Sequence, residues 1–126
     1  MKPIYLDNNA TTRVDPAVVD AMLPFFTEHF GNASSIHAFG SEVGKALKKA
    51  RSQVQALLGA EHDSEIIFTS CGTESDSTAI HSALKAQPDR NTVITTNVEH
   101  PAILTLCDWL EKEGYIVHKL KVDKKG

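Results

Sequence analysis

Hydrophobic residues recur along the chain with two different periods, one typical of buried strands and one typical of helices. Short apolar runs with β-branched residues indicate strands, whereas apolar residues three and four positions apart indicate one face of a helix. The two kinds of segment alternate, which predicts an α/β fold with a parallel, doubly wound sheet built from βαβ units. The expected strands lie at residues 4–6, 65–69, 91–96 and 115–120.

Proline, glycine and capping residues mark the ends of the expected helices. Asp15 followed by Pro16 is an N-cap with a proline at the first helical position. Pro24 is expected to bend or split the helix that they open. The helices are expected from Asp15 to Gly31, from Ser41 or the residues just before it to about Leu58, from Thr73 onwards, and from Pro101 to Gly114.

The turn that joins the expected strand at 65–69 to the next helix is the most informative stretch. It reads Ser70-Cys71-Gly72, and the helix begins at Thr73. The first N–H groups of a helix have no intrahelical partner and carry partial positive charge, so this turn is either an anion site or an ordinary capped βα turn. Gly72 lets the backbone approach a ligand, and the Thr73 hydroxyl either caps the helix or donates to a phosphate.

Two acidic residues follow in the same helical turn. Thr73 with Asp76 three residues later resembles a capping box. Glu74 and Asp76 suit the helix dipole, but they would repel a bound phosphate if they pointed at it. An anion site therefore requires both carboxylates to face away.

A second polar turn, Glu99-His100, follows the expected strand at 91–96. Ligands of parallel sheets bind beyond the carboxyl ends of the strands, so the Ser70–Thr73 turn and this turn are expected to face one pocket. By itself, a histidine before Pro101 is more often structural than chemical. Neither G-x-x-x-x-G-K-[ST] nor G-x-G-x-x-G is present, so the familiar nucleotide-binding loops are not indicated.

The two cysteines do not form a recognisable chemical site. Cys71 lies at a helix N-terminus, where a thiolate is stabilised, but no base partner is evident, and we do not expect it to be a nucleophile. Cys107 lies on the inner face of its helix and is expected in the core. Their number and spacing indicate neither a disulfide framework nor a metal site.

Composition narrows the class of protein further. The 126 residues, 41% of them hydrophobic, are typical of a soluble globular protein, and the net charge of −3 does not indicate nucleic-acid binding. No apolar run reaches roughly 18 residues and no hydrophobic signal region is visible, so no membrane span is predicted and a cytoplasmic location is expected. The chain ends directly after a strand-like segment, which indicates the front part of a longer protein.

Four segments together resemble the amino-terminal part of the cysteine desulfurases of the NifS and IscS kind, with the NifS branch the closer likeness. The segments occur in the family's order and spacing and span essentially the whole chain. They are YLDNNATT at residues 5–12, GNASSIHAFG at 31–40, FTSCGTES at 68–75 and VEHPAI at 98–103.

The resemblance implies a fold and a reaction. The fold is that of the aspartate-aminotransferase-like enzymes (fold type I), with residues 1–14 as an N-terminal arm and residues 15–126 as an incomplete large domain. The cofactor is pyridoxal 5′-phosphate, and L-cysteine is converted to L-alanine while sulfur passes to an enzyme persulfide. The implied partners are an iron–sulfur scaffold protein, in nitrogenase or general cluster assembly, and a second copy of the full-length chain.

The resemblance also implies site residues. Gly72 and Thr73 match the phosphate-contacting pair, and His100 matches the histidine stacked on the pyridine ring, which is also suited to moving protons. The loop at 7–12 and the loop around His37 would surround the substrate mouth. No metal ligand is implied.

The chain departs from the family pattern in two respects. The family's phosphate turn commonly reads Ser-Gly-Ala-Thr, whereas Cys71 places a thiol where glycine is usual. The Schiff-base lysine, the aspartate that pairs with the pyridine nitrogen and the sulfur-accepting cysteine all lie later in the family's chain. We therefore predict that these residues alone are inactive. A selenocysteine lyase, another aminotransferase-like enzyme and a non-catalytic relative are the alternatives.

Overall fold

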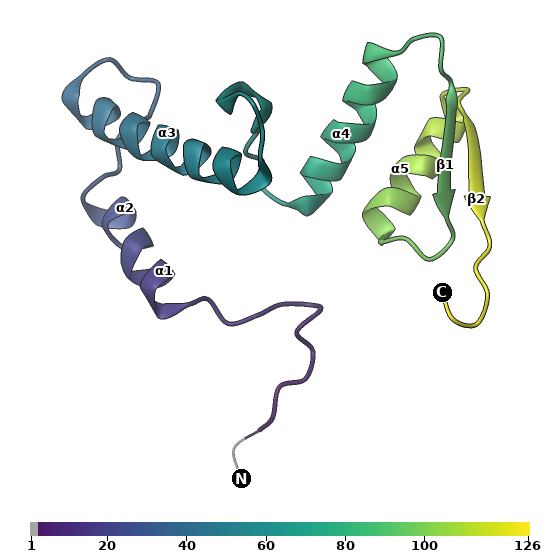
Figure 1. The fold of residues 1–126 in the computed structure, drawn as a ribbon, viewed down its shortest axis with the longest axis horizontal. Coiled ribbons are helices and arrows are strands. Elements are labelled where there is room, and N and C mark those ends of the chain that lie inside the picture. The colour runs from purple at the N-terminus through teal and green to yellow at the C-terminus, as the bar shows by residue number, and fades with distance from the viewer. Residues whose placement is uncertain (1–2) are drawn as a thin grey trace. The chain divides into compact units, whose positions relative to one another are not determined.

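The computed structural model describes residues 3–126, which fold into two compact units that divide between Ile66 and Ile67 (Figure 1). Each unit is described by itself. No helix within the described residues is both long and apolar enough to cross a membrane.

The first unit consists of helices joined by turns. Asp15 caps the first helix, because its carboxylate accepts a hydrogen bond of 2.8 Å from the backbone N–H of Ala17. Pro24 splits the helical stretch as predicted, and Gly59 ends the long helix in the left-handed conformation at φ 70°. The helices are α1 (Pro16–Met22), α2 (Pro24–Thr27), α3 (Ala38–Leu58) and the 3₁₀ turn η1 (Asp63–Glu65).

The loop before α3 packs tightly against the first turn of α3 at two glycines, Gly31 in the loop and Gly40 in the helix. A Cβ atom on Gly31 would lie 2.4 Å from the carbonyl oxygen of Phe39, and one on Gly40 would lie 2.4 Å from that of Ser35. Gly40 is also buried. Backbone oxygens are not able to move aside as flexible side chains do, so the close approach of the loop and the helix requires a residue without a side chain at both positions.

The second unit contains a βαβ motif preceded by a helix. Its elements are α4 (Gly72–Ala86), β1 (Thr92–Thr96), α5 (Pro101–Lys112) and β2 (Ile116–Leu120). The two strands are parallel, with Thr92 opposite Ile116 and Thr96 opposite Leu120. The chain between them forms α5, which contacts β2 and also α4 (Figure 1). The alternating order predicted from the hydrophobic pattern is confirmed here.

The core of this unit lies on the inner face of α5. Leu106, Cys107 and Leu110 are buried, so the predicted core position of Cys107 is confirmed. At the edge of this core, Lys119 of β2 forms ion pairs with Asp108 and, at 3.2 Å, with Glu111 of α5. These pairs raise the pKa of Lys119 and fix the strand against the helix.

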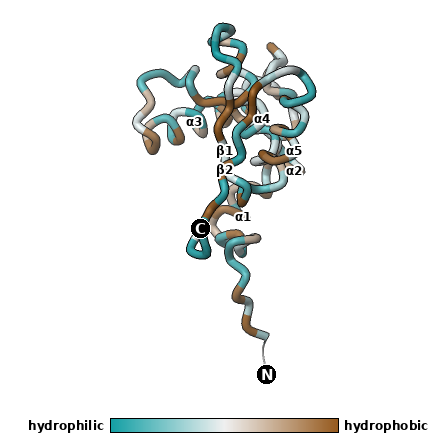
Figure 2. Tube along the Cα trace, turned by 90° about the vertical axis from the view of Figure 1, so that its right-hand side faces the viewer, coloured by the Kyte–Doolittle hydropathy of each residue, from teal (hydrophilic) through white to brown (hydrophobic). Residues whose placement is uncertain are grey.

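The opposite face of the two strands is uncovered. Ile94, Ile116 and Leu120 point to this face and are 66%, 48% and 54% exposed. Figure 2 colours the apolar residues of the strands brown. Parallel sheets are normally covered on both faces, and in complete domains other elements pack against a face of this kind.

Two predicted strands are not formed. Residues 4–6 and 66–69 have no regular secondary structure, and the sheet in the described chain consists of β1 and β2. The hydrophobic run alone does not make a strand, because a strand also requires a neighbour with which to exchange backbone hydrogen bonds. The Tyr5 hydroxyl instead donates to the backbone oxygen of Asp7 at 2.8 Å, inside its own segment.

Candidate functional site

Helix α4 begins directly at the polar turn that the sequence singled out. Its N-cap residue is Cys71, whose side chain makes no capping hydrogen bond with the first turn. Gly72 is the first helical residue, and a Cβ atom built on it would meet nothing within 4 Å. The helix start is therefore open to an approaching group. The Cys71 side chain forms no capping hydrogen bond with the first turn, although the Glu74 N–H lies close enough to the sulfur to lower the pKa of the thiol.

The acidic side chains of this turn differ from the predicted arrangement. The Thr73–Asp76 capping box is not formed, because the helix starts earlier and Cys71 takes the cap position. The Glu74 carboxylate instead accepts hydrogen bonds from the backbone N–H of Ser70 at 2.7 Å and from its hydroxyl at 2.6 Å. The Ser70 hydroxyl, followed by the Ser70 N–H, lowers the pKa of Glu74, so its carboxylate remains ionised beside Ser70.

His100 caps the helix that follows β1. Its Nδ1 atom accepts a hydrogen bond of 3.2 Å from the backbone N–H of Ala102, and Pro101 occupies the first helical position. A ring nitrogen that accepts this bond carries no proton, so the neutral imidazole holds its proton on Nε2. The cap thus fixes both the orientation of the ring and the nitrogen that is available to a ligand.

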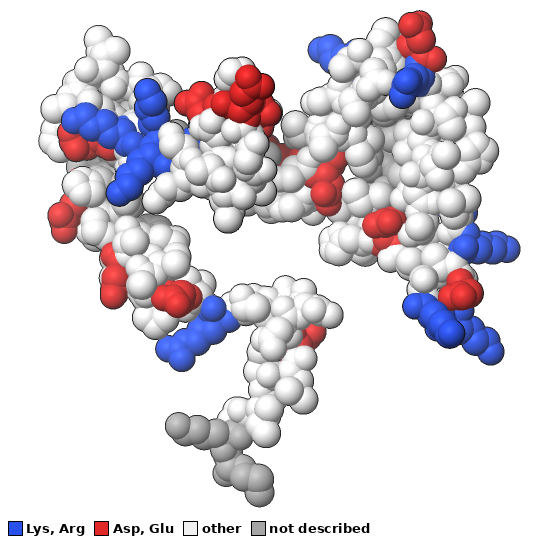
Figure 3. Space-filling view, viewed as in Figure 1, with Lys and Arg blue, Asp and Glu red and all other residues white. Residues whose placement is uncertain are grey.

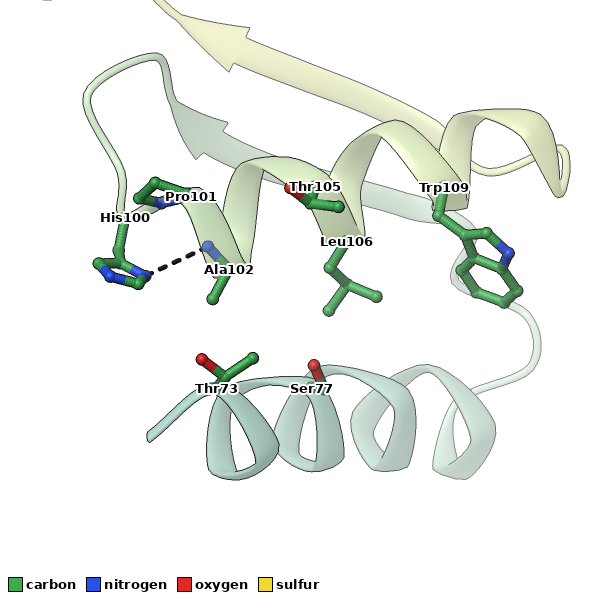
Figure 4. Close-up of a pocket in the computed structure, with 8 residues that line it drawn as sticks. All are labelled: Thr73, Ser77, His100, Pro101, Ala102, Thr105, Leu106 and Trp109. Atoms are coloured by element: carbon green, nitrogen blue, oxygen red, sulfur yellow. Dashed lines mark hydrogen bonds between the residues drawn. The ribbon is translucent and has the colours of Figure 1, made fainter. Parts of the chain in front are cut away.

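Thr73 and His100 line the same hollow between α4 and α5. Its volume is about 620 Å³, and the two residues lie at one end of it, with Trp109 at the other (Figure 4). The structure thus places one residue from each of the two predicted turns, Thr73 and His100, on one pocket, although no strand forms before the first turn. The lining residues are Thr73, Ser77, His100, Pro101, Ala102, Thr105, Leu106 and Trp109. Gly72 is not among them, although it precedes Thr73 in the chain.

Sequence reasoning missed the polar and aromatic residues farther along this hollow. Ser77 lies four residues after Thr73, and Trp109 lies four residues after Thr105. That spacing places each pair on one face of its helix and was the available signal. Trp109 also packs edge-on against His81, with ring centroids 5.2 Å apart, which ties α4 to α5 at the far end.

The two thiols have opposite environments. Cys71 is exposed, and the backbone N–H of Glu74, followed by the Ser70 hydroxyl, lowers its pKa. Burial raises the pKa of Cys107. No histidine or carboxylate hydrogen-bonds to either sulfur within residues 3–126, and the helix start alone does not make Cys71 a nucleophile.

The residues around the hollow fit a phosphorylated aromatic group. The open helix start offers N–H groups and a threonine hydroxyl to a phosphate, and the neutral imidazole offers an aromatic face to a ring. No lysine or arginine occurs between Ile66 and Leu84, so this turn contributes dipoles rather than cations. The nearest dense group of basic side chains in sequence is on α3 of the first unit (Figure 3).

The two remaining sequence motifs lie in the first unit. The loop at 7–12 is tied by the Tyr5 hydroxyl to the backbone of Asp7 and Thr11. His37 is the N-cap residue of α3 without a side-chain cap bond, and its ring lies edge-on to Phe39. Both motifs are ordered by local contacts, and their substrate-side role stays a prediction.

Comparison with known proteins identifies close relatives. The aminotransferase class-V model matches residues 4–126. Over its whole length the chain is 77% identical to "Cysteine desulfurase NifS" of Azotobacter vinelandii and 67% identical to a cysteine desulfurase of Gluconacetobacter diazotrophicus. It covers 31% and 32% of these two proteins, so it spans about a third of their length.

Solved structures give the same result. A NifS-like protein superposes with a TM-score of 0.85 at 40% identity, over 93% of this chain and 32% of its own. The structure of SspA in complex with cysteine superposes with a TM-score of 0.84 at 33% identity, over 92% and 33% of the two chains. The fold is therefore that of the fold type I enzymes, which depend on pyridoxal 5′-phosphate. Because the family model matches it from residue 4 to residue 126, the chain belongs to the aminotransferase class-V family.

Proposed function

We propose that the full-length protein is a pyridoxal-phosphate-dependent cysteine desulfurase that converts L-cysteine to L-alanine and passes the sulfur to one of its own cysteines as a persulfide. The 77% identity to a NifS cysteine desulfurase over the whole chain carries this proposal. The hollow lined by both Thr73 and His100 supports it, because it brings a helix start of the kind that suits a phosphate near an aromatic ring.

Within this chain, Gly72 and Thr73 are the proposed phosphate contacts. The backbone N–H groups of the first turn of α4 and the Thr73 hydroxyl would donate hydrogen bonds to the phosphate oxygens. Gly72 contributes by having no side chain at the point of closest approach. The positive charge that balances the phosphate would come from elsewhere in the protein, since the turn itself has none.

His100 is the proposed ring contact. Pyridoxal phosphate supplies an electron sink for the bonds at the α-carbon of the amino acid. The imidazole face of His100 would pack on the cofactor ring, and its Nε2 would hold or move a proton, because Nδ1 is engaged with the Ala102 N–H. The helix cap therefore assigns the proton to one nitrogen.

The remaining parts of the proposal concern the whole protein. Residues 15–126 would form the first part of the large cofactor domain, with residues 1–14 as an arm at the substrate side. The rest of the protein would supply the Schiff-base lysine, the partner of the pyridine nitrogen and the sulfur-accepting cysteine. We further propose a cytoplasmic homodimer that delivers sulfur to an iron–sulfur scaffold protein, with nitrogenase as the destination.

The test is an assay of the purified full-length protein. L-Cysteine should yield L-alanine, together with sulfide in equal amount once a thiol reductant is present, and removal of the cofactor should abolish both. Alanine formed only from selenocysteine would replace the proposal with a selenocysteine lyase. Absence of cofactor absorbance in the visible region, with no alanine from either substrate, would favour a non-catalytic relative.

A further inference from the structure

The side chain of Glu74 turns back across the start of α4 onto Ser70. One carboxylate oxygen, Oε2, accepts both the backbone N–H of Ser70 at 2.7 Å and its hydroxyl at 2.6 Å. Ser70 is the last residue before the N-cap, so these two bonds join the incoming chain to the first turn of the helix. We call this arrangement the Glu74–Ser70 contact.

This contact closes the turn without using the helix's own free donors. In an ordinary cap, the N-cap side chain accepts from an N–H of the first turn and occupies it. Here the N-cap side chain of Cys71 makes no such bond, and Glu74 accepts from Ser70 outside the helix instead. A second hydrogen bond, between the hydroxyls of Thr69 and Ser75 at 2.6 Å, joins the residue before Ser70 to the first turn of the helix.

We propose that Glu74 is a positioning residue for the phosphate cradle, by which we mean the first N–H groups of α4 and the Thr73 hydroxyl. By holding the backbone of Ser70-Cys71-Gly72 in place, Glu74 would keep these donors where they meet the cofactor phosphate. The inference rests on the proposed function, because it assigns the cradle its ligand. Glu74 itself would not touch the phosphate.

The negative charge of Glu74 could have the opposite effect on phosphate binding. A carboxylate in the first turn repels a phosphate by like charge, so removal of Glu74 would strengthen binding if its charge dominated. The hydrogen bonds to Ser70 lower the pKa of Glu74, so its charge is present at neutral pH. The two effects predict opposite signs for one variant, and a titration separates them.

The test uses the full-length protein with its cofactor removed, titrated with pyridoxal 5′-phosphate and with pyridoxal, which has no phosphate. Glu74→Ala should weaken binding of the phosphorylated form about tenfold, because the displaced turn would lose about one hydrogen bond to the charged phosphate, and should change pyridoxal binding less than about twofold. Glu74→Gln retains an acceptor for Ser70 without the charge, and should recover most of the lost affinity.

Asp76→Ala is the matched control, because Asp76 is an acidic residue of the same helix that takes no part in the Glu74–Ser70 contact. The Asp76→Ala protein should bind both ligands as the wild type does. A Glu74→Ala protein that binds pyridoxal 5′-phosphate as tightly as the wild type, or more tightly, would overturn the proposal. An equal loss for pyridoxal would also overturn it, since the effect would then not pass through the phosphate.

Two further outcomes are decisive. Ser70→Ala, which removes only the hydroxyl half of the contact, should weaken phosphate-dependent binding about threefold and gives a reading even if Glu74→Ala does not fold; unchanged affinity there would count against the proposal. A wild-type protein that binds no pyridoxal 5′-phosphate would overturn the proposed function together with this inference, whereas normal wild-type binding with an unaffected Glu74→Ala protein overturns the inference alone.

Discussion

His100 is both a helix cap and an aromatic ring, and two different substitutions separate these properties. Asparagine is a good N-cap but has no aromatic ring, whereas phenylalanine has a ring but no acceptor for the Ala102 N–H. In the full-length protein, His100→Asn should therefore unfold near the wild-type temperature but lose on the order of 10²-fold in desulfurase rate. His100→Phe should lose about 1 kcal/mol of stability with its cap.

Thermal unfolding of the cofactor-free proteins and the rate of alanine formation measure these two effects. If His100→Asn turned over cysteine at the wild-type rate, His100 would be a structural cap and no more. That result would return it to the role that its position before Pro101 indicates when the residue is considered alone.

The two thiols should differ in their reaction with iodoacetamide. The thiolate is the reactive form, so the lowered pKa and exposure of Cys71 predict labelling at a pH where an ordinary thiol is mostly protonated, with the rate falling as pH drops through its pKa. Cys107 is buried with a raised pKa and should stay unlabelled until the protein unfolds. Peptide mass mapping after timed labelling of the cofactor-free protein checks both, and faster labelling of Cys107 would contradict the structure.

Among the elements, the first turn of α3 should not tolerate a side chain at Gly40, where it packs against the preceding loop. Gly40→Ala places a Cβ atom 2.4 Å from a backbone oxygen in a buried position, and should destabilise the protein by about 1–3 kcal/mol through overpacking. Gly44→Ala is the control, because its Cβ atom would lie 3.3 Å from the nearest such oxygen and alanine favours the helix. Urea unfolding of the two variants measures the difference; equal stability would show that the loop adjusts freely.

The elements also show which features of the fold were predictable. Helix starts at Pro16 and Pro101, the break at Pro24 and the stop at Gly59 follow from local chemistry, and all are present. The strands at 4–6 and 65–69 were expected from their apolar runs but are not formed, because a strand depends on a partner that the run does not encode.

The site, like the fold, was predictable only in part. Thr73 and His100 line one pocket as expected, but only His100 follows a strand of the sheet, because the strand expected before Thr73 is not formed. The Glu74–Ser70 contact was not predicted, because sequence spacing made Asp76 the expected capping partner of Thr73. Which donor a side chain selects depends on where the helix begins, and Cys71 is neither a proline nor a strong N-cap residue that would mark this start in the sequence.

For the whole molecule, one face of the sheet is uncovered and the chain spans about a third of its relatives' length. Both observations lead us to expect that the chain alone is inactive. The 126 residues alone should release no sulfide from L-cysteine above a protein-free control that contains the free cofactor, because no lysine of the family's Schiff-base motif is present. Sulfide release by the isolated chain would contradict this, and the full-length protein under the same conditions is the positive control.

The most direct test of the proposed site is the affinity of the cofactor-free, full-length protein for pyridoxal 5′-phosphate when Thr73 is replaced by alanine. Thr78→Ala is the matched control, since Thr78 lies on the same helix but outside the hollow. Loss of a hydrogen bond to a phosphate predicts about tenfold weaker binding for Thr73→Ala and no change for Thr78→Ala. Equal affinities for Thr73→Ala and the wild type would contradict the placement of the phosphate at the start of α4.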